Sequence, residues 1–222
     1  MTGTGDTGQG IHLGGCMLIR RSFLKNLTAS AATLAGASTL ESCAPAAAHA
    51  QGPSPASGRP LPKPPAGSKW DFSWLDRMTK PHRMAFDHNT TDQEMVFGQA
   101  EGWMDGAKDW YGVGDDQLNA VIILRHVAAE IALPDEMRLR VGPKITGTMT
   151  MEPLVQRGAI VLACNRALTG LGGMLAKKDN VPEEEGQRLI RAALRPGVYL
   201  VPNGVFGVAL AQEAGCGFFR VG

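Results

Sequence analysis

The sequence predicts a three-layer α/β sandwich around a five-stranded, mainly parallel sheet. Two observations lead to this prediction. Short apolar segments alternate with amphipathic segments through residues 83–222, and such alternation is typical of βα units that build a parallel sheet. In addition, the segment LNAVIILRH (118–126) is almost continuously apolar, which indicates a strand covered on both faces.

The first unit is expected to consist of a strand at RMAFDHN (83–89) and a long helix. Thr91 and Glu94 have the spacing of a capping box, which would satisfy free amides at the start of this helix. Its buried face should follow the helical spacing of Val96, Ala100, Trp103, Ala107 and Trp110. On another face, Gly98, Gly102 and Gly106 indicate the close approach of another backbone, either the sheet or a second subunit.

The remaining elements are expected in chain order. They are a buried strand at 118–126, a helix interrupted near Pro134 within 127–142, a short helix capped by Thr150 and ended by Gly158, a strand at 159–168, a helix that begins with Pro182 and ends at Pro196-Gly197, a strand at 197–204, a short helix at 205–215 and a closing strand at 216–222. The GLGGM segment near 171–174 is interpreted as a flexible loop. The acidic run Glu183–Glu185 is interpreted as a helix amino terminus and not as a metal site.

Residues 1–50 have the features of an export signal. LIRRSFLKN (18–26) precedes an apolar, uncharged stretch and the small-x-small site Ala48-His49-Ala50, so we expect cleavage after Ala50. Arg20-Arg21 with Phe23, Leu24 and Lys25 match the twin-arginine pattern, from which only Ile19 departs. The alternative is a general secretory signal that carries two arginines by chance. Met17 would give a conventional signal, and is the expected true start.

The signal predicts a periplasmic protein that passes through the twin-arginine translocase. The apolar stretch is too short and too polar for a transmembrane anchor. A lipid anchor at Cys43 is disfavoured because Glu41 disrupts the lipoprotein pattern. Residues 51–68 are rich in Pro, Gly and Ser and are interpreted as a tether, so the folded domain should comprise residues 69–222.

Charge excludes two classes of partner. The full sequence has a formal net charge of +1, and removal of the leader takes away Arg20, Arg21, Lys25, Asp6 and Glu41. The exported chain is then formally neutral and carries no run of basic residues. We therefore expect no binding to nucleic acid or to an anionic membrane surface.

Candidate functional residues lie where the predicted parallel strands end, because ligands bind beyond the carboxyl ends of such strands. Cys164 is the candidate nucleophile, since helix amides and a guanidinium from Arg166 or Arg125 would favour its thiolate. His126 could act as a base, a metal ligand or an anion donor at the same edge. The other candidate ligand-binding residues at strand ends are His88, Arg125, Asn165 and Asn203.

Structural roles remain open for the same side chains. Cys164 could be a small apolar residue at the edge of the core, and His126 or His88 could be hydrogen-bonded structural residues. A metal site formed by His88, His126 and Cys164 is conceivable from the ligand types, although the separations lack the compact spacing of zinc sites. Cys216 is expected at the opposite end of the sheet, too far from Cys164 for a disulfide, and is interpreted as core.

The sequence lacks a G-x-S-x-G elbow, a GxGxxG motif after the first strand, a P-loop and an HExxH motif. With its five βα units, the thiol in GAIVLACNRAL and the terminal segment PGVYLVPNGVFGVALAQEAGCGFFRVG, the chain resembles the DsrE/DsrF-like (YchN-like) family, in particular its exported members with a twin-arginine signal. The resemblance covers residues of about 80–222. The long 127–158 insertion and the absence of a cysteine-bearing tail depart from the family pattern.

The resemblance implies a homo-oligomer in which Cys164 carries a persulfide and exchanges sulfane sulfur with a carrier protein or a small sulfur compound. His126 and Arg166 would then tune the thiolate. The alternative is a non-catalytic binding or assembly module of the same fold. Its strand-end pocket would hold a small ligand or a metal that the sequence does not identify. Whether the protein is an enzyme stays open.

Overall fold

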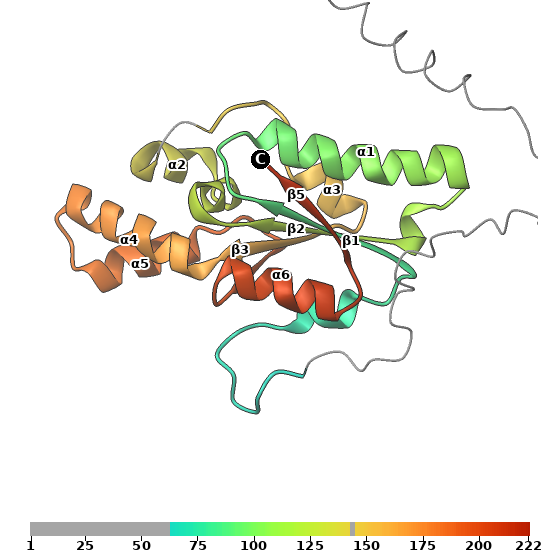
Figure 1. The fold of residues 1–222 in the computed structure, drawn as a ribbon. Coiled ribbons are helices and arrows are strands. Elements are labelled where there is room, and N and C mark those ends of the chain that lie inside the picture. The colour runs from blue at the N-terminus through green and yellow to red at the C-terminus, as the bar shows by residue number, and fades with distance from the viewer. Residues whose placement is uncertain (1–62, 143–144) are drawn as a thin grey trace, which may run out of the picture. The chain divides into compact units, whose positions relative to one another are not determined.

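The computed structural model describes residues 63–142 and 145–222, so the predicted leader and residues 51–62 of the predicted tether lie outside the described residues. A five-stranded sheet with the order β4-β3-β2-β1-β5 forms the centre of the fold (Figure 1). All of its strand pairings are parallel. The predicted α/β fold is therefore confirmed. The strands are β1 (His82–His88), β2 (Leu118–Leu124), β3 (Ile160–Cys164), β4 (Val198–Val201) and β5 (Gly217–Val221).

Helices cover both faces of this sheet, and Figure 1 shows α1 and α6 on opposite sides of it. The α-helices are α1 (Gln93–Tyr111), α2 (Asp135–Val141), α3 (Glu152–Gln156), α4 (Asn165–Asp179), α5 (Glu183–Ala192) and α6 (Gly204–Glu213). Short 3₁₀ helices are η1 (Ser73–Arg77), η2 (Asp115–Gln117) and η3 (His126–Ala132). Among the described residues, no helix is both long enough and apolar enough to cross a bilayer.

The continuous apolar run of β2 is explained by burial on both faces. Ile122 and Leu124 lie in a core cluster with residues of α1, η3 and α4. Val121 and Ile123 point the other way, into a second cluster that contains Trp74 of η1 and residues of α6. Successive side chains of a strand face opposite sides of its sheet, so both sides of β2 need apolar residues. Every residue of β2 is buried.

The amino terminus of α1 differs from the predicted capping box. Asp92 is the N-cap residue, and its side chain accepts a hydrogen bond from the Met95 amide at 3.1 Å. Glu94 instead accepts hydrogen bonds from the Thr148 amide at 2.6 Å and the Thr148 hydroxyl at 2.9 Å. Glu94 therefore bonds to the segment before α3, a partner distant in sequence that a local spacing rule does not detect.

The predicted packing of α1 is also only partly correct. Val96 and Ala100 are fully buried, but Trp110, predicted on the same face, is 83% exposed. No described backbone atom outside α1 lies within 4 Å of a Cβ built at Gly98, Gly102 or Gly106. The sheet is therefore not in close contact with these three glycines, and their contact with a second subunit stays a prediction.

The segment after β3 is helical, where the sequence suggested more strand and then a loop. The strand predicted at 159–168 ends at Cys164, and α4 begins with the next residue and continues through the GLGGM segment. The glycines have a packing reason. A Cβ at Gly172 would lie 2.5 Å from Gln187 Cα, and a Cβ at Gly186 would overlap the Gly172 carbonyl oxygen. Helices α4 and α5 therefore pack with their backbones in direct contact.

Two other differences concern short helices. The interruption predicted at Pro134 is present, but the part before it is the 3₁₀ helix η3, and Pro134 is the N-cap residue of α2. The N-cap of α3 is Met151 and not Thr150, because Pro153 lies in the first turn and the helix begins only at Glu152. Gly158 follows this helix with a φ of 100°, as expected for a glycine that ends a helix.

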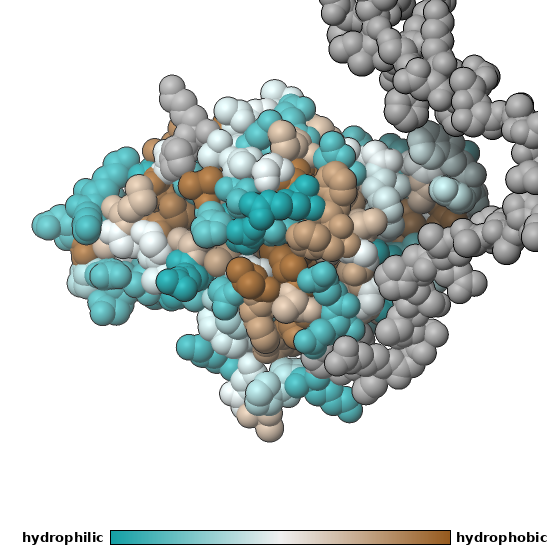
Figure 2. Space-filling model, in the orientation of Figure 1, coloured by the Kyte–Doolittle hydropathy of each residue, from teal (hydrophilic) through white to brown (hydrophobic). Residues whose placement is uncertain are grey.

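One edge of the sheet is formed by β5, which pairs with β1. Four of its five residues are exposed, including Phe218 and Phe219 at 45% and 43%. Figure 2 shows hydrophobic surface, in brown, in the middle of this face of the molecule. An edge strand leaves backbone hydrogen-bonding groups unpaired along one side.

Candidate functional site

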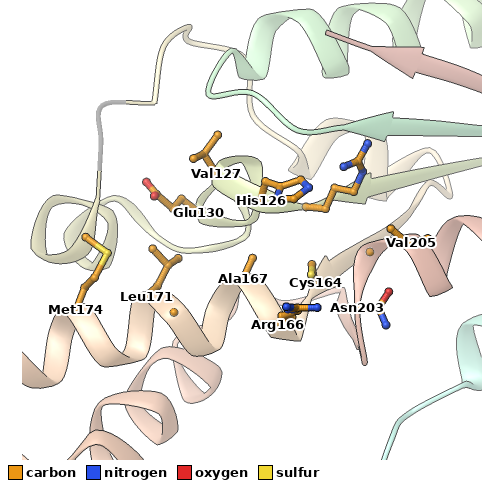
Figure 3. Close-up of a pocket in the computed structure, with 13 residues that line it drawn as sticks. His126, Val127, Glu130, Cys164, Arg166, Ala167, Leu171, Met174, Asn203 and Val205 are labelled. Carbon is orange, nitrogen blue, oxygen red and sulfur yellow. The ribbon is translucent and has the colours of Figure 1, made fainter.

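A cavity of about 770 Å³ opens at the carboxyl ends of β2 and β3. This is the edge at which sequence reasoning placed the site. Three chain segments form it: the start of η3, the first turns of α4 and the start of α6 (Figure 3). The lining residues are Arg125, His126, Val127, Glu130, Cys164, Arg166, Ala167, Gly170, Leu171, Met174, Asn203, Gly204 and Val205. The predicted candidates Cys164, His126, Arg166, Arg125 and Asn203 thus share one cavity.

Cys164 is the last residue of β3 and the N-cap residue of α4. Cys164 is 6% exposed, and it lines the cavity. The position of Cys164 follows from the local sequence, because the apolar strand ends there and a helix of fifteen residues begins with the next residue. Free amides at a helix amino terminus carry partial positive charge. The Cys164 thiol therefore lies at the amino terminus of α4 and at the edge of the cavity.

Arg125 adds a full positive charge near this thiol. It donates hydrogen bonds from Nε to Asp87 Oδ1 at 2.5 Å and from Nη2 to Asp87 Oδ2 at 2.7 Å. These bonds are the main cause that raises the pKa of Arg125, and Cys164 adds a smaller electrostatic contribution in the same direction. Asp87 is a buried residue of β1, so the guanidinium is fixed in orientation by a bidentate pair.

Gly204 provides the room for Arg125. A Cβ at Gly204, the first residue of α6, would lie 2.5 Å from Arg125 Cβ and 3.0 Å from its Cδ. Any larger residue would push the arginine stem away from Asp87. This glycine, which sequence reasoning did not select, is therefore part of the construction of the site.

His126 lies at the mouth of the cavity with an unusual backbone. Its φ is 53°, in the left-handed region, and its side chain is exposed. For a residue other than glycine this conformation costs about 1–2 kcal/mol. The left-handed conformation of His126 turns the chain from the end of β2 into η3. Figure 3 shows the His126 ring beside the cavity and above Cys164. His126 is thus placed as predicted, without a hydrogen bond from its ring to another described residue.

Asn203 and Arg166 complete the polar end of the cavity. Asn203 is the N-cap residue of α6, and its Oδ1 accepts the Phe206 amide at 2.8 Å. Its side-chain amide group is left to donate toward a ligand. Arg166 is exposed, lies in the first turn of α4, and forms no salt bridge with a residue in the described ranges. Both Arg166 and Cys164 line the cavity.

Two predicted ligand-binding residues lie outside this cavity. His88 is fully buried at the end of β1, where its Nδ1 lies 3.2 Å from the Val221 carbonyl oxygen. Burial lowers its pKa and thereby favours the neutral ring. Asn165 points to the other side of the strand end, where its Oδ1 accepts a hydrogen bond from Arg191 Nε at 2.9 Å. Both positions serve packing between elements.

The geometry does not assemble the metal cluster conceived from the sequence. His88 does not line the cavity that contains His126 and Cys164. Within residues 63–142 and 145–222, no three His, Cys, Asp or Glu side chains are arranged to hold a metal ion. Cys216 precedes β5 at the opposite end of the parallel sheet from Cys164, and both cysteines are free and buried. Their predicted separation is confirmed.

Sequence reasoning missed Glu130, the one acidic side chain that lines the cavity. It is 1% exposed, and its Oε2 has no hydrogen-bond partner in the described parts of the chain. Burial raises its pKa to about 7, although Arg138 acts in the opposite direction. A signal for it exists in the sequence: Glu130 is the only charged residue in the apolar run VAAEIAL (127–133).

The part of the cavity wall that α4 contributes after Arg166 is mainly apolar. Ala167, Leu171 and Met174 of α4 face Val127 of η3 across the cavity (Figure 3). Met174 is 52% exposed and Val127 is 42% exposed, so the cavity is open to solvent along this side. Sequence reasoning missed this wall because it interpreted the GLGGM segment as a loop.

Comparison with solved structures gives a distant likeness. No protein-family model matches the chain, and no curated protein matches it. Among solved structures, it is similar to one described as "Structure of Protein of Unknown Function MTH1491 from Methanobacterium thermoautotrophicum", at 13% sequence identity and a TM-score of 0.39. The match covers 63% of this chain and 98% of that chain. This likeness carries no conclusion about function, and the resemblance to the DsrE-like family stays a prediction.

Proposed function

We propose that the protein is a sulfur carrier of the DsrE-like type, in which Cys164 holds sulfane sulfur as a persulfide. The observation that carries this proposal is the position of the thiol. Cys164 combines a helix amino terminus, a nearby fixed guanidinium and an opening into a cavity of about 770 Å³. A thiolate is the reactive form of cysteine, and positive charge around it also attracts an anionic sulfur donor.

The transfer needs no redox partner. The Cys164 thiolate attacks the outer sulfur of an anionic donor such as thiosulfate. A bond forms between Sγ and that sulfur, while the bond between the two sulfurs of the donor breaks and its electron pair leaves with sulfite. The product is a Cys164 persulfide anion. A second thiolate that attacks the outer sulfur reverses the process and regenerates the Cys164 thiolate. Arg166 and the Asn203 amide group would bind the donor and the leaving anion.

The second cysteine of the described chain provides a contrast. Cys216 is buried, and this burial raises its pKa to about 12, with a smaller opposing effect from Arg83. It lies outside the cavity and faces the core formed by η1 and α6. At neutral pH it is a thiol in an apolar environment, and such cysteines are inert.

The proposed setting is the periplasm, after export through the twin-arginine translocase and removal of residues 1–50. The proposed assembly is a homo-oligomer that receives sulfur from a small sulfur compound or a carrier protein. A second candidate function is a small-ligand binding module without turnover. The apolar wall of Leu171 and Met174 favours this candidate, because binding pockets for small molecules are mostly apolar with a few placed polar groups.

The test is the mass of the full chain after incubation with thiosulfate or polysulfide in the absence of reductant. We expect a gain of one sulfur atom that reductant removes, and peptide mapping should place it on Cys164. Cys164→Ser should abolish this adduct, whereas the matched control Cys216→Ser should retain it. An unmodified Cys164 that nevertheless reacts with a small alkylating reagent would refute the sulfur carrier and favour the binding module.

A further inference from the structure

The cavity beside Cys164 is larger than an inorganic donor requires. Its volume of about 770 Å³ falls within the range of about 300–1,000 Å³ that is typical of sites for organic small molecules. Thiosulfate, a small and strongly hydrated dianion, would occupy only the polar part next to the thiol. It would leave the apolar side chains of the cavity in contact with water, so the size and the lining favour a donor with an organic part.

Helix α4 supplies an apolar row along this space. Ala167, Leu171 and Met174 follow one another at intervals of four and three residues, so they share one face of the helix, and all three line the cavity. Figure 3 shows them in order along α4, with Ala167 nearest to Cys164. The row extends over seven residues of α4, or about 10 Å along the helix axis. An aliphatic chain that starts at the thiol can therefore follow this row.

The apolar row is accessible to a ligand. Met174 is 52% exposed, and Val127, which η3 contributes to the same cavity, is 42% exposed. Covering these side chains with another apolar group removes them from water, which is favourable in proportion to the area covered. The carboxyl group of Glu130 takes no part in such binding, because it is buried against Gly142 at the end of α2.

Hydrogen-bond donors for one anionic group lie at the thiol. Helix α4 has no side-chain cap, so its first backbone amides have no intrahelical partner. Arg125 uses Nε and Nη2 to bind Asp87, which leaves its Nη1 outside that pair. Arg166 and Asn203 line the same cavity and carry further N–H donors. A sulfonyl group, with two acceptor oxygens, matches donors of this kind.

We infer that the sulfur donor is an alkanethiosulfonate, whose thiosulfonate group lies at Cys164 and whose aliphatic chain covers Leu171 and Met174. The sulfur step rests on the proposed function, whereas the site for the chain rests on the apolar row of α4. The Cys164 thiolate attacks the terminal sulfur of the donor, and a bond forms between Sγ and that sulfur. The bond between the two donor sulfurs breaks, and its electron pair leaves with the alkanesulfinate. The product is the Cys164 persulfide anion, and no oxidant, reductant or proton is consumed.

The experiment compares methane-, propane- and hexanethiosulfonate, which share one reacting group and differ only in chain length. Intact mass of the full chain, without reductant, gives the second-order rate constant for the gain of one sulfur atom. A fully buried methylene group changes affinity by about fourfold, and the apolar row is only partly covered. We therefore expect an increase of about twofold per methylene, or about thirtyfold from the methane to the hexane compound.

Gly170 offers a variant that blocks the chain without disturbing the core. It lines the cavity and is exposed, and a Cβ built there meets nothing within 4 Å. Gly170→Trp should slow loading from the hexane compound far more than loading from the methane compound. Gly102→Trp is the matched control, because Gly102 is an exposed glycine of α1 with equally free surroundings, and it should keep the full dependence on chain length. Met174→Gln is a second variant, in an exposed side chain, and should weaken the dependence.

Loading that does not depend on chain length, or a dependence that Gly170→Trp leaves unchanged, would overturn the inference and leave the sulfur carrier standing. Calorimetry with methane- and hexanesulfonate, which have no sulfur to transfer, separates the two proposals. If no donor loads sulfur but hexanesulfonate binds more tightly, and Gly170→Trp removes this difference, the sulfur carrier is refuted and the site for an organic anion stands. Absence of both loading and sulfonate binding would refute both proposals.

Discussion

Replacement of Asp87 by asparagine should destabilise the fold strongly, because Arg125 would lose the partner of a largely buried charge. The side chains of Arg125 and Asp87 are 12% and 5% exposed, and two charge-assisted hydrogen bonds join them. Each such bond contributes about 1.5–3 kcal/mol, and loss of one partner of a buried pair costs about 3–5 kcal/mol. Water in the cavity can reach Arg125, and asparagine keeps one acceptor. We therefore expect the free energy of unfolding to fall by about 3 kcal/mol, near the lower end of this range.

The assay is urea denaturation followed by circular dichroism at neutral pH. Asp105→Asn is the matched control. Asp105 binds Arg157 at 2.7 Å but is 53% exposed, and Arg157 keeps a second partner in Asp115. Exposed pairs contribute at most about 1 kcal/mol, so this control should lose no more than that. If the two variants lose similar amounts of stability, the argument that Asp87 compensates a buried charge is wrong.

Three further predictions follow from the packing, from a titrating group and from a helix cap. Gly186→Ala should lower the free energy of unfolding by about 1–3 kcal/mol, because its methyl group would overlap α4. Gly102→Ala, where nothing lies within 4 Å, should raise it by up to about 1 kcal/mol; chemical denaturation of both variants checks the contrast, and equal losses would contradict it. Burial raises the pKa of Glu130 from 4.5 to about 7, so the folded state binds more protons than the unfolded state in this range. Its contribution to stability is complete below pH 4.5 and is lost as the pH rises to about 7, up to about 3 kcal/mol at 1.36 kcal/mol per pH unit. Denaturation of wild type and Glu130→Gln at several pH values measures this term, and parallel pH profiles would disprove it. Asn203→Ala should cost about 1 kcal/mol through loss of the α6 cap, whereas Asn203→Asp should keep the cap; thermal unfolding distinguishes the two.

The sequence was informative where a local pattern leaves few structural possibilities. A continuous apolar run such as β2 can only be a strand buried on both faces or a buried helix, and its short length and β-branched residues favour the strand. The edge that contains Cys164, His126 and Arg125 follows from the parallel topology, because all carboxyl ends of the strands meet there. These predictions needed no knowledge of which segments touch.

The predictions that were wrong depended on contacts between distant segments. Glu94 has the spacing of a capping box, but Thr148 offers it amide and hydroxyl donors that lie 54 residues away in the chain. The GLGGM segment, which contains Gly172, resembles a loop until α4 and α5 are seen to touch through Gly172 and Gly186. The buried Glu130 was overlooked for the same reason, since no local rule shows that Gly142 covers its carboxyl group.

The pairing of β5 with β1 sets an order on the biosynthesis of this fold. The contact between His88 and Val221 joins residues that are 133 positions apart. While the ribosome produces the segments between them, one long side of β1 has no neighbour. An unpaired strand edge is a template for association with other chains. A nascent chain therefore passes through a vulnerable period, and a factor that shields β1 until Gly217–Val221 emerge should increase the yield of native protein.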